Sequence, residues 1–369
     1  MLADKTVVLG ITGSIAAYKA ADVAGKLTQA GAKVEVVMTD AATKFIAPLT
    51  LRSLTGRAVV TDVFDLASQH GVGHIALGEM ADVVVIAPAT ASLIAKLAVG
   101  IADDMVTLTV LATKAPVIVA PAMNVNMFEN PITQENLAKL KARGFTIVDP
   151  AYGRLASGKM GRGRLADVDI IIGTIKQVLG RSGDLAGKRL VVTAGGTQEA
   201  IDPARHIGNR SSGKMGYAMA EAARDRGARV SQIAPPTCLL EPIGMEVVHI
   251  ETAAQMKEAV AKAVAQADVL IMAAAVADYQ PKVVAKAKIK KEAPSLTLEL
   301  VRTPDILTEV KGDFLKVGFA AESQDVVENA RQKLEKKQLD IIVANDITDK
   351  DSGFSVDTNK VTLIDRDGK

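Results

Sequence analysis

The segment Val191–Gly216 constrains the possible fold of this chain more than any other stretch. It continues an apolar, β-branched run that starts at Leu190 and predicts a buried parallel strand. A glycine turn, Gly195-Gly196-Thr197, follows, where backbone N–H groups can approach an anion closely. A polar loop then reaches Ser211-Ser212-Gly213, which predicts the cap of a helix that begins near Lys214. A long polar loop that ends at a helix N-terminus is typical of phosphorylated-ligand binding, and a plain surface loop is the alternative.

The chain begins with a similar arrangement of residues. An apolar strand is predicted at Thr6–Ile11, followed by the turn Thr12-Gly13-Ser14 and by an alanine-rich helix from Ile15 to about Ala30. A strand, a turn of small residues and a helix start can hold a phosphate on backbone amides. The turn lacks the GxGxxG spacing of dinucleotide sites, so a mononucleotide such as FMN is favoured over NAD. Ordinary turn chemistry explains the same residues equally well.

Strands and helices alternate in both halves of the chain, which predicts parallel sheets with helices on both faces. A length of 369 residues predicts two domains, and the linker Gly180-Arg181-Ser182-Gly183 divides them into 1–183 and 184–369. The predicted fold class is therefore α/β, with two Rossmann-like parallel-sheet domains. The predicted strands include Lys33–Met38, Val83–Ile86, Val117–Ala120, Leu190–Val192, Val230–Ile233, Val269–Met272 and Ile341–Ala344, and the predicted helices include Ala91–Val99, Asp104–Thr113, Ile170–Leu179, Met215–Arg226 and Ala253–Ala265.

Ligands of such sheets bind beyond the carboxyl ends of the strands, and the first half places polar residues there. Asn124 follows a predicted strand and can donate a hydrogen bond to a carboxylate. His74 is one of four histidines, and a neutral imidazole can act as a base, although a structural histidine is the more common case. The glycine-rich stretch Gly153–Gly163 is typical of a mobile lid.

The second half places charged residues around the same kind of edge. Asp278 follows a buried strand and can hold a divalent cation, while a helix-capping role is about equally consistent with its position. Lys288 and Lys290 alternate with Ile289, which predicts an extended strand with both lysines on one face rather than a plain solvated run. Lys333 and Lys337 are spaced to share one helix face.

The pattern TAGGTxExIDPxRxIxNxSSGKMG, at residues 193–216, resembles the opening signature of a phosphopantothenate–cysteine ligase. This ligase is the second half of the bacterial bifunctional coenzyme A biosynthesis family. The preceding residues resemble the partner half, a flavodoxin-like flavoprotein of the cysteine decarboxylase type. The resemblance spans nearly the whole chain. It implies CTP-dependent ligation of cysteine to 4′-phosphopantothenate through an acyl-cytidylate, followed by FMN-dependent decarboxylation to 4′-phosphopantetheine.

The resemblance also implies roles for residues of the first half. His74 would be the catalytic histidine, and Asn124 would act in catalysis by holding the substrate carboxylate. Ser157 stands where many family members carry a lid cysteine that returns a proton, and a serine hydroxyl is a far weaker acid than a thiol. Either water or another group of the lid would then donate that proton, or the reductive half-reaction would be slow. The residues expected to contact FMN are Gly13, Ser14, Thr39 and Thr90.

The second half would contain the CTP site and the ligase chemistry. Asn209 would bind substrate and stabilise the acyl-cytidylate, Arg205 would help bind phosphopantothenate, and Lys288 would act as a catalytic lysine. Asp278 would hold Mg²⁺ against the triphosphate, because two anions must be brought together. The residues that the resemblance assigns to CTP are Met272, Ala273, Ala274, Asp278, Lys288, Pro304, Asp305, Ile306, Leu307, Phe319, Lys333 and Lys337.

Composition narrows the possible partners. The formal net charge of +2 gives no reason to expect nucleic acid or a membrane as a partner. The single cysteine, Cys238, and an N-terminus that does not resemble a signal peptide predict a reducing cytoplasm. A homo-oligomer is expected. The alternatives are a ligase whose flavin domain is retained for assembly or regulation, a non-catalytic flavoprotein subunit and, least favoured, an NAD-dependent dehydrogenase.

Overall fold

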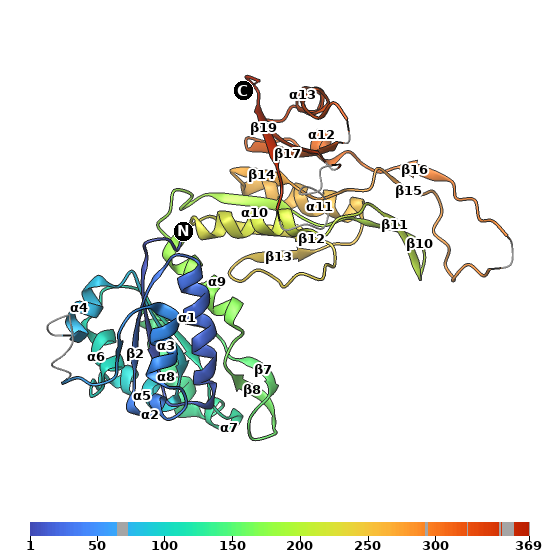
Figure 1. Cartoon of the computed structure of the whole chain (residues 1–369). Coiled ribbons are helices and arrows are strands. Elements are labelled where there is room, and N and C mark those ends of the chain that lie inside the picture. Colours follow the sequence, from blue (N-terminus) through green and yellow to red (C-terminus); the bar gives the residue numbers. More distant parts are fainter. Residues whose placement is uncertain (65–72, 292–293, 323, 347, 349–357, 369) are drawn as a thin grey trace. The chain divides into compact units, whose positions relative to one another are not determined.

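The computed structural model describes residues 1–64, 73–291, 294–322, 324–346, 348 and 358–368 (Figure 1). They form two compact units, Met1–Gly180 and Arg181–Lys369, and each unit is described by itself. The assignment of separate reactions to domains 1–183 and 184–369 stays a prediction.

Within its described residues, the first unit contains a six-stranded parallel sheet with the strand order β3-β2-β1-β4-β5-β6. In this doubly wound order the chain changes direction between β1 and β4, which is where ligands of such sheets bind. The strands are β1 (Thr6–Ile11), β2 (Lys33–Met38), β3 (Val59–Val60), β4 (Val83–Ala89), β5 (Val117–Pro121) and β6 (Thr146–Ile147). The other elements are η1 (Ile15–Tyr18), α1 (Lys19–Gln29), α2 (Asp40–Thr43), α3 (Pro48–Thr55), α4 (Gly73–Met80), α5 (Ala91–Val99), α6 (Met105–Ala112), α7 (Val125–Phe128), α8 (Pro131–Ala142), α9 (Val168–Gly180) and the hairpin of β7 (Ala151–Arg154) and β8 (Met160–Arg164).

Helices cover both faces of this sheet because its central strands are apolar on both sides. Leu9 and Ile11 of β1 lie in a buried cluster with side chains of α1, α3 and α9. Val8, which points the other way, lies in a second cluster with side chains of α4, α5, α6 and α8. The predicted alternation of buried strands and helices is confirmed in this unit, with β1 and α5 at the bounds expected.

The second unit repeats the same connectivity. Its described residues form a seven-stranded sheet with the order β13-β12-β9-β14-β17-β18-β19, in which β19 alone runs antiparallel to its neighbour. The chain changes direction between β9 and β14. Helix α10 covers one face, and α11, α12 and α13 cover the other. These elements are β9 (Arg189–Thr193), α10 (Lys214–Asp225), β12 (Arg229–Ala234), β13 (Glu246–His249), α11 (Ala253–Ala263), η2 (Val264–Gln266), β14 (Val269–Met272), α12 (Ile306–Glu309), β17 (Leu315–Glu322), α13 (Val326–Lys336), β18 (Ile341–Asp346) and β19 (Val361–Asp365).

Two hairpins project from this unit, and here the structure differs from the sequence prediction. One joins β10 (Gln198–Asp202) to β11 (Arg205–Gly208) where a polar loop was predicted, and the other joins β15 (Tyr279–Pro281) to β16 (Leu300–Arg302) (Figure 1). We call residues 198–208 and the described part of 279–302 the hairpin extension. The strand predicted around Lys288 is wrong: the segment is irregular, and Ile289 N donates to Asp202 Oδ2 at 3.1 Å instead of pairing in a ladder.

Candidate active sites

The glycine turn of the second unit lies where the sheet changes direction. Gly195 O accepts a hydrogen bond from Ala275 N at 2.8 Å, so the residues after β9 and β14 are tied together. Thr197, which is fully buried, accepts at Oγ1 from Ala277 N at 2.9 Å. The carboxyl ends of the two central strands therefore form one fixed edge, as expected for a ligand site in this fold.

The start of α10 packs directly against this turn, and glycine is what allows it. A Cβ on Gly216 would lie 2.5 Å from Ala194 Cβ and 2.8 Å from Thr193 O. A Cβ on Gly196 would lie 2.7 Å from Asn209 O. The turn, the end of the β10–β11 hairpin and the N-terminus of α10 therefore approach each other at backbone distance.

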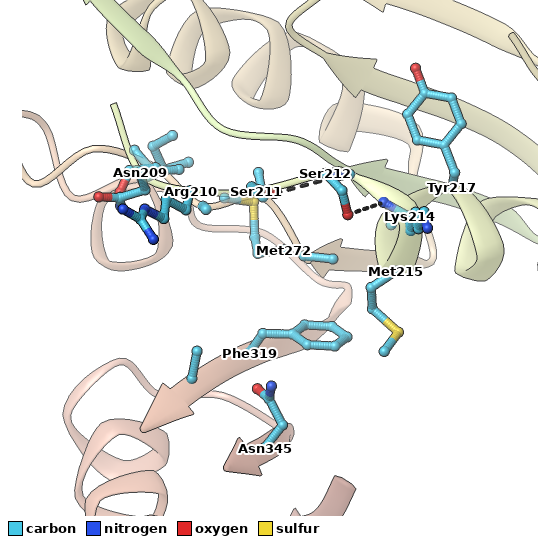
Figure 2. Close-up of a pocket in the computed structure, with 18 of the residues that line it drawn as sticks. Asn209, Arg210, Ser211, Ser212, Lys214, Met215, Tyr217, Met272, Phe319 and Asn345 are labelled. Atoms are coloured by element: carbon cyan, nitrogen blue, oxygen red, sulfur yellow. Dashed lines mark hydrogen bonds between the residues drawn. The ribbon is translucent and has the colours of Figure 1, made fainter. Parts of the chain in front are cut away.

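A cavity of about 1460 Å³ lies over this edge. Figure 2 shows Phe319 and Asn345 on one side of it, below the Ser211–Ser212 segment in this view. Eleven of the twelve residues assigned to CTP line the cavity, together with Asn209, and they come from the ends of β14 and β17 and from α12 and α13. These eleven are Met272, Ala273, Ala274, Asp278, Pro304, Asp305, Ile306, Leu307, Phe319, Lys333 and Lys337.

Arg205 and Lys288 are not among the described residues that line this cavity. Both belong to the hairpin extension, where Arg205 Nη2 donates to Ile289 O at 2.7 Å. Asn209 lies at the end of the same hairpin and donates through Nδ2 to Val276 O at 2.9 Å. The structure thus brings Asn209 to the cavity and leaves the other two on the extension.

Two lysines supply positive charge on the α13 side of the cavity. Lys333 is half-buried and donates to Phe319 O at 2.7 Å. Burial lowers the pKa of its ammonium, and the nearby Lys337 lowers it further. Lys337 pairs with Asp305 Oδ1 at 3.2 Å. Burial alone would raise the pKa of the Asp305 carboxyl, but Thr308 and Lys337 outweigh it and lower the pKa.

Other lining residues were not expected from the sequence. Tyr217 and Leu239 come from α10 and from the loop after β12, and Asn345 comes from the end of β18. Asn345 could have been found, because it directly follows the predicted strand Ile341–Ala344 and a parallel strand brings its carboxyl end to this edge. Tyr217 carries no comparable signal in the sequence.

In the first unit, three hydroxyl side chains cap helices at the carboxyl ends of parallel strands. Ser14 Oγ accepts from Ala16 N at 3.3 Å, and Thr39 and Thr90 cap α2 and α5 in the same way. The turn at Gly13 is packed closely, since a Cβ there would lie 2.5 Å from Ala41 Cβ. Helix starts of this kind present backbone N–H groups to an anion.

Asn124 and the β7–β8 hairpin form a second feature of this edge. Asn124 caps α7, and its Nδ2 donates to Ser157 Oγ in the turn of the hairpin at 3.0 Å. Gly163 O accepts from Met123 N at 2.9 Å, which holds β8 against this loop. His74 is half-buried in the first turn of α4.

Comparisons with known proteins agree with this two-unit architecture. Residues 1–180 match the family described as Flavoprotein, and residues 185–369 match the DNA/pantothenate metabolism flavoprotein C-terminal domain. The chain is therefore a two-unit α/β flavoprotein. In the part of it that the structure describes, no helix is both long and apolar enough to cross a membrane.

Full-length relatives narrow this class to one family. The coenzyme A biosynthesis bifunctional protein CoaBC of Bacillus subtilis is 46% identical, over 100% of this chain and 92% of its own. The CoaBC protein of Mycobacterium bovis is also 46% identical, over 99% and 91%. The chain belongs to the CoaBC family of bifunctional coenzyme A biosynthesis proteins. A solved C-terminal domain of a CoaBC protein is 44% identical over 50% of this chain and 85% of its own, with a TM-score of 0.43.

Proposed function

We propose that the two reactions of this family are divided between the two units, with ligation in domain 184–369 and decarboxylation in domain 1–183. The protein is an enzyme of coenzyme A biosynthesis with phosphopantothenate–cysteine ligase and phosphopantothenoylcysteine decarboxylase activities. Because decarboxylation acts on the ligation product, the units work in the reverse of their chain order. We place the reaction in the cytoplasm, where the single thiol of Cys238 would stay reduced.

The cavity of the second unit is the proposed site of CTP. Lys333 and Lys337 supply the positive charge that a triphosphate and a second anionic substrate require. No cluster of three or more metal-ligating side chains occurs among the described residues, so Mg²⁺ would be shared between Asp278 and phosphate oxygens, as is usual for this ion. The choice of CTP over other nucleotides rests on the family resemblance.

Asn209 is the proposed stabiliser of the acyl-cytidylate formed from phosphopantothenate and CTP. Its amide is a neutral donor at the edge of the cavity, and a neutral donor can stabilise the negative charge that develops when the cysteine amine attacks. Arg205 and Lys288 would meet the phosphopantothenate and nucleotide phosphates from the hairpin extension. Val283, Leu296 and Leu300 leave large apolar side chains exposed on that extension, which supports a homo-oligomer.

The first unit is the proposed site of decarboxylation. The helix starts capped by Ser14, Thr39 and Thr90 fit the phosphate and ring edges of FMN, because they present backbone donors and hydroxyls at one edge of the sheet. When bound, FMN supplies the oxidation beside the carboxylate that makes loss of CO2 possible. Asn124 would hold the substrate carboxylate, His74 would serve as the catalytic base, and the β7–β8 hairpin would exclude water.

The observation that carries this proposal is that Asn209, Lys333 and Lys337 line one cavity in a member of the CoaBC family. The test is incubation of the purified chain with phosphopantothenate, CTP, Mg²⁺ and cysteine, with products identified by mass. We expect pyrophosphate, the cysteine amide and then its decarboxylated form, together with flavin absorbance. An amide that accumulates without release of CO2 would favour the ligase-only alternative, and no consumption of CTP would refute the ligase assignment.

A further inference from the structure

A second, smaller cavity of about 400 Å³ lies beside the main cavity of the second unit. Its own wall includes His206 of β11 and the loop residues Pro236, Thr237 and Cys238. Asn209, Ser211, Ser212, Lys214 and Leu239 line both cavities. The segment 209–214 is therefore a wall that the two cavities share.

Close packing against neighbouring backbone holds this wall in place. A Cβ on Gly208 would lie 2.5 Å from Thr197 O, and one on Gly213 would lie 3.4 Å from Gly195 Cα and from Thr237 Cγ2. The backbone of the wall thus packs against the glycine turn. Asn209 stays at a fixed place where groups from both cavities can meet.

We propose that the smaller cavity receives the amino acid cysteine, so that its amine meets the acyl group at Asn209, in the wall that the two cavities share. This proposal rests on the ligase function proposed above. The ligase needs three substrates, and the larger cavity would be occupied by the nucleotide and the acid joined to it. The third substrate then needs its own approach to Asn209, and the smaller cavity, which Asn209 also lines, provides one.

The lining of the smaller cavity suits a small zwitterion. Lys214 and the hydroxyls of Ser211 and Ser212, which line both cavities, lie at the N-terminus of α10, where a carboxylate is favoured by charge and by the helix dipole. Such an orientation would leave the amine of the substrate directed along the wall toward Asn209. A volume of about 400 Å³ exceeds what one amino acid needs and is too small for a nucleotide together with phosphopantothenate.

Attack of the cysteine amine on the acyl-cytidylate forms an amide and releases CMP and two protons. The amine nitrogen forms a bond to the acyl carbon, and the bond from that carbon to the bridging phosphate oxygen breaks, with the electron pair leaving on CMP. The substrate ammonium loses one proton before attack and a second as the adduct collapses. The imidazole of His206, which lines the smaller cavity, can accept one of these protons, and solvent water takes up the other.

The single thiol of the chain offers a test in the folded protein. Cys238 is exposed and lies in the wall of the smaller cavity only, so an alkylating reagent can fill that cavity without touching the larger one. The purified protein is treated with iodoacetamide or with a bulkier maleimide, freed of reagent and checked by mass. The Cys238→Ser protein, treated identically, is the matched control.

We expect alkylation to raise the KM for cysteine by at least about tenfold, and more for the bulkier reagent. Pyrophosphate formation from CTP and phosphopantothenate without cysteine should stay within about twofold of the untreated rate. An unchanged KM for cysteine in fully alkylated protein would overturn the proposal. So would a raised KM for phosphopantothenate, because the cavity would then belong to the acid substrate. Absence of pyrophosphate from untreated protein would instead remove the ligase function itself.

Discussion

Asn124 Nδ2 donates a hydrogen bond to Ser157 Oγ at 3.0 Å. This bond joins the loop after β5 to the turn of the β7–β8 hairpin, two segments that are 33 residues apart. The residue proposed to hold the substrate carboxylate is thus in direct contact with Ser157, at the position where the family resemblance implies a lid cysteine. Closure of the hairpin and placement of the carboxylate would therefore depend on each other.

Substitution Ser157→Cys should speed the return of a proton to the decarboxylated product. A thiol with an ordinary pKa of about 8.5 is a far better acid than a hydroxyl, so we expect a rise of roughly tenfold or more in formation of the reduced product. The measurement follows CO2 and the product thiol from supplied phosphopantothenoylcysteine. Ser157→Ala should keep the original rate of proton return if water is the donor, while loss of the bond from Asn124 should weaken substrate binding. If the Ser157→Cys variant forms the reduced product at the original rate, proton return does not limit the reaction and the prediction is wrong.

Substitution Asn209→Asp should block ligation. The change replaces the donor to Val276 O with a carboxylate, which repels both that carbonyl and the developing negative charge. We expect formation of the cysteine amide to fall by at least about a hundredfold, with any activated acid accumulating. Asn345→Asp adds the same charge to the same cavity at the end of β18 and should have a much smaller effect. Normal ligation by the Asn209 variant would refute its role.

Substitution Lys333→Met should change how stability depends on pH. Burial lowers the pKa of Lys333 in the folded chain, so between the lowered and the ordinary pKa the unfolded chain binds more protons than the folded one. The free energy of unfolding of the unchanged protein therefore rises with pH in this window. The variant has no titrating group at position 333, so its free energy of unfolding lacks this rise. We expect Tm of the unchanged protein minus Tm of the variant to increase from neutral to alkaline pH. A difference that falls with pH would contradict the shift.

Substitution Gly216→Ala should damage the second unit alone. The added Cβ would meet Ala194 Cβ at 2.5 Å and Thr193 O at 2.8 Å, so the N-terminus of α10 must move. We expect a loss of about 1–3 kcal/mol in the free energy of unfolding and a loss of ligase activity. Gly25→Ala is the control, because its Cβ would meet only Leu54 Cδ2 at 3.9 Å. Decarboxylation of supplied substrate should survive in both variants.

The sequence predicts the sheets well because their strands are buried on both faces. The apolar run at Val269–Met272 leaves little choice of structure, and it has the predicted bounds. The hairpin extension could not be predicted in the same way. Its strands are short and polar, and tertiary contacts such as the bond from Ala285 N to Ile201 O at 3.0 Å hold it in place. No local periodicity encodes such contacts.

The residues of the candidate sites also divide into those that the sequence can place and those that it cannot. Residues that directly follow a predicted strand, such as Ala273, could be placed at one edge because parallel strands bring their carboxyl ends together. Lys288 could not be placed, since its position depends on the path of the hairpin extension across other parts of the fold. The terminal hairpin predicted for residues 353–365 is described only from residue 358 onward, where β19 does run antiparallel to β18.

The antiparallel strand β19 shields the edge of β18, which would otherwise present unpaired backbone groups to other molecules. Thr358 and Asn359, just before β19, also line the larger cavity. Loss of the pairing of Val361–Asp365 with β18 would therefore open this edge to self-association and leave Thr358 and Asn359, at the cavity, without the strand that follows them.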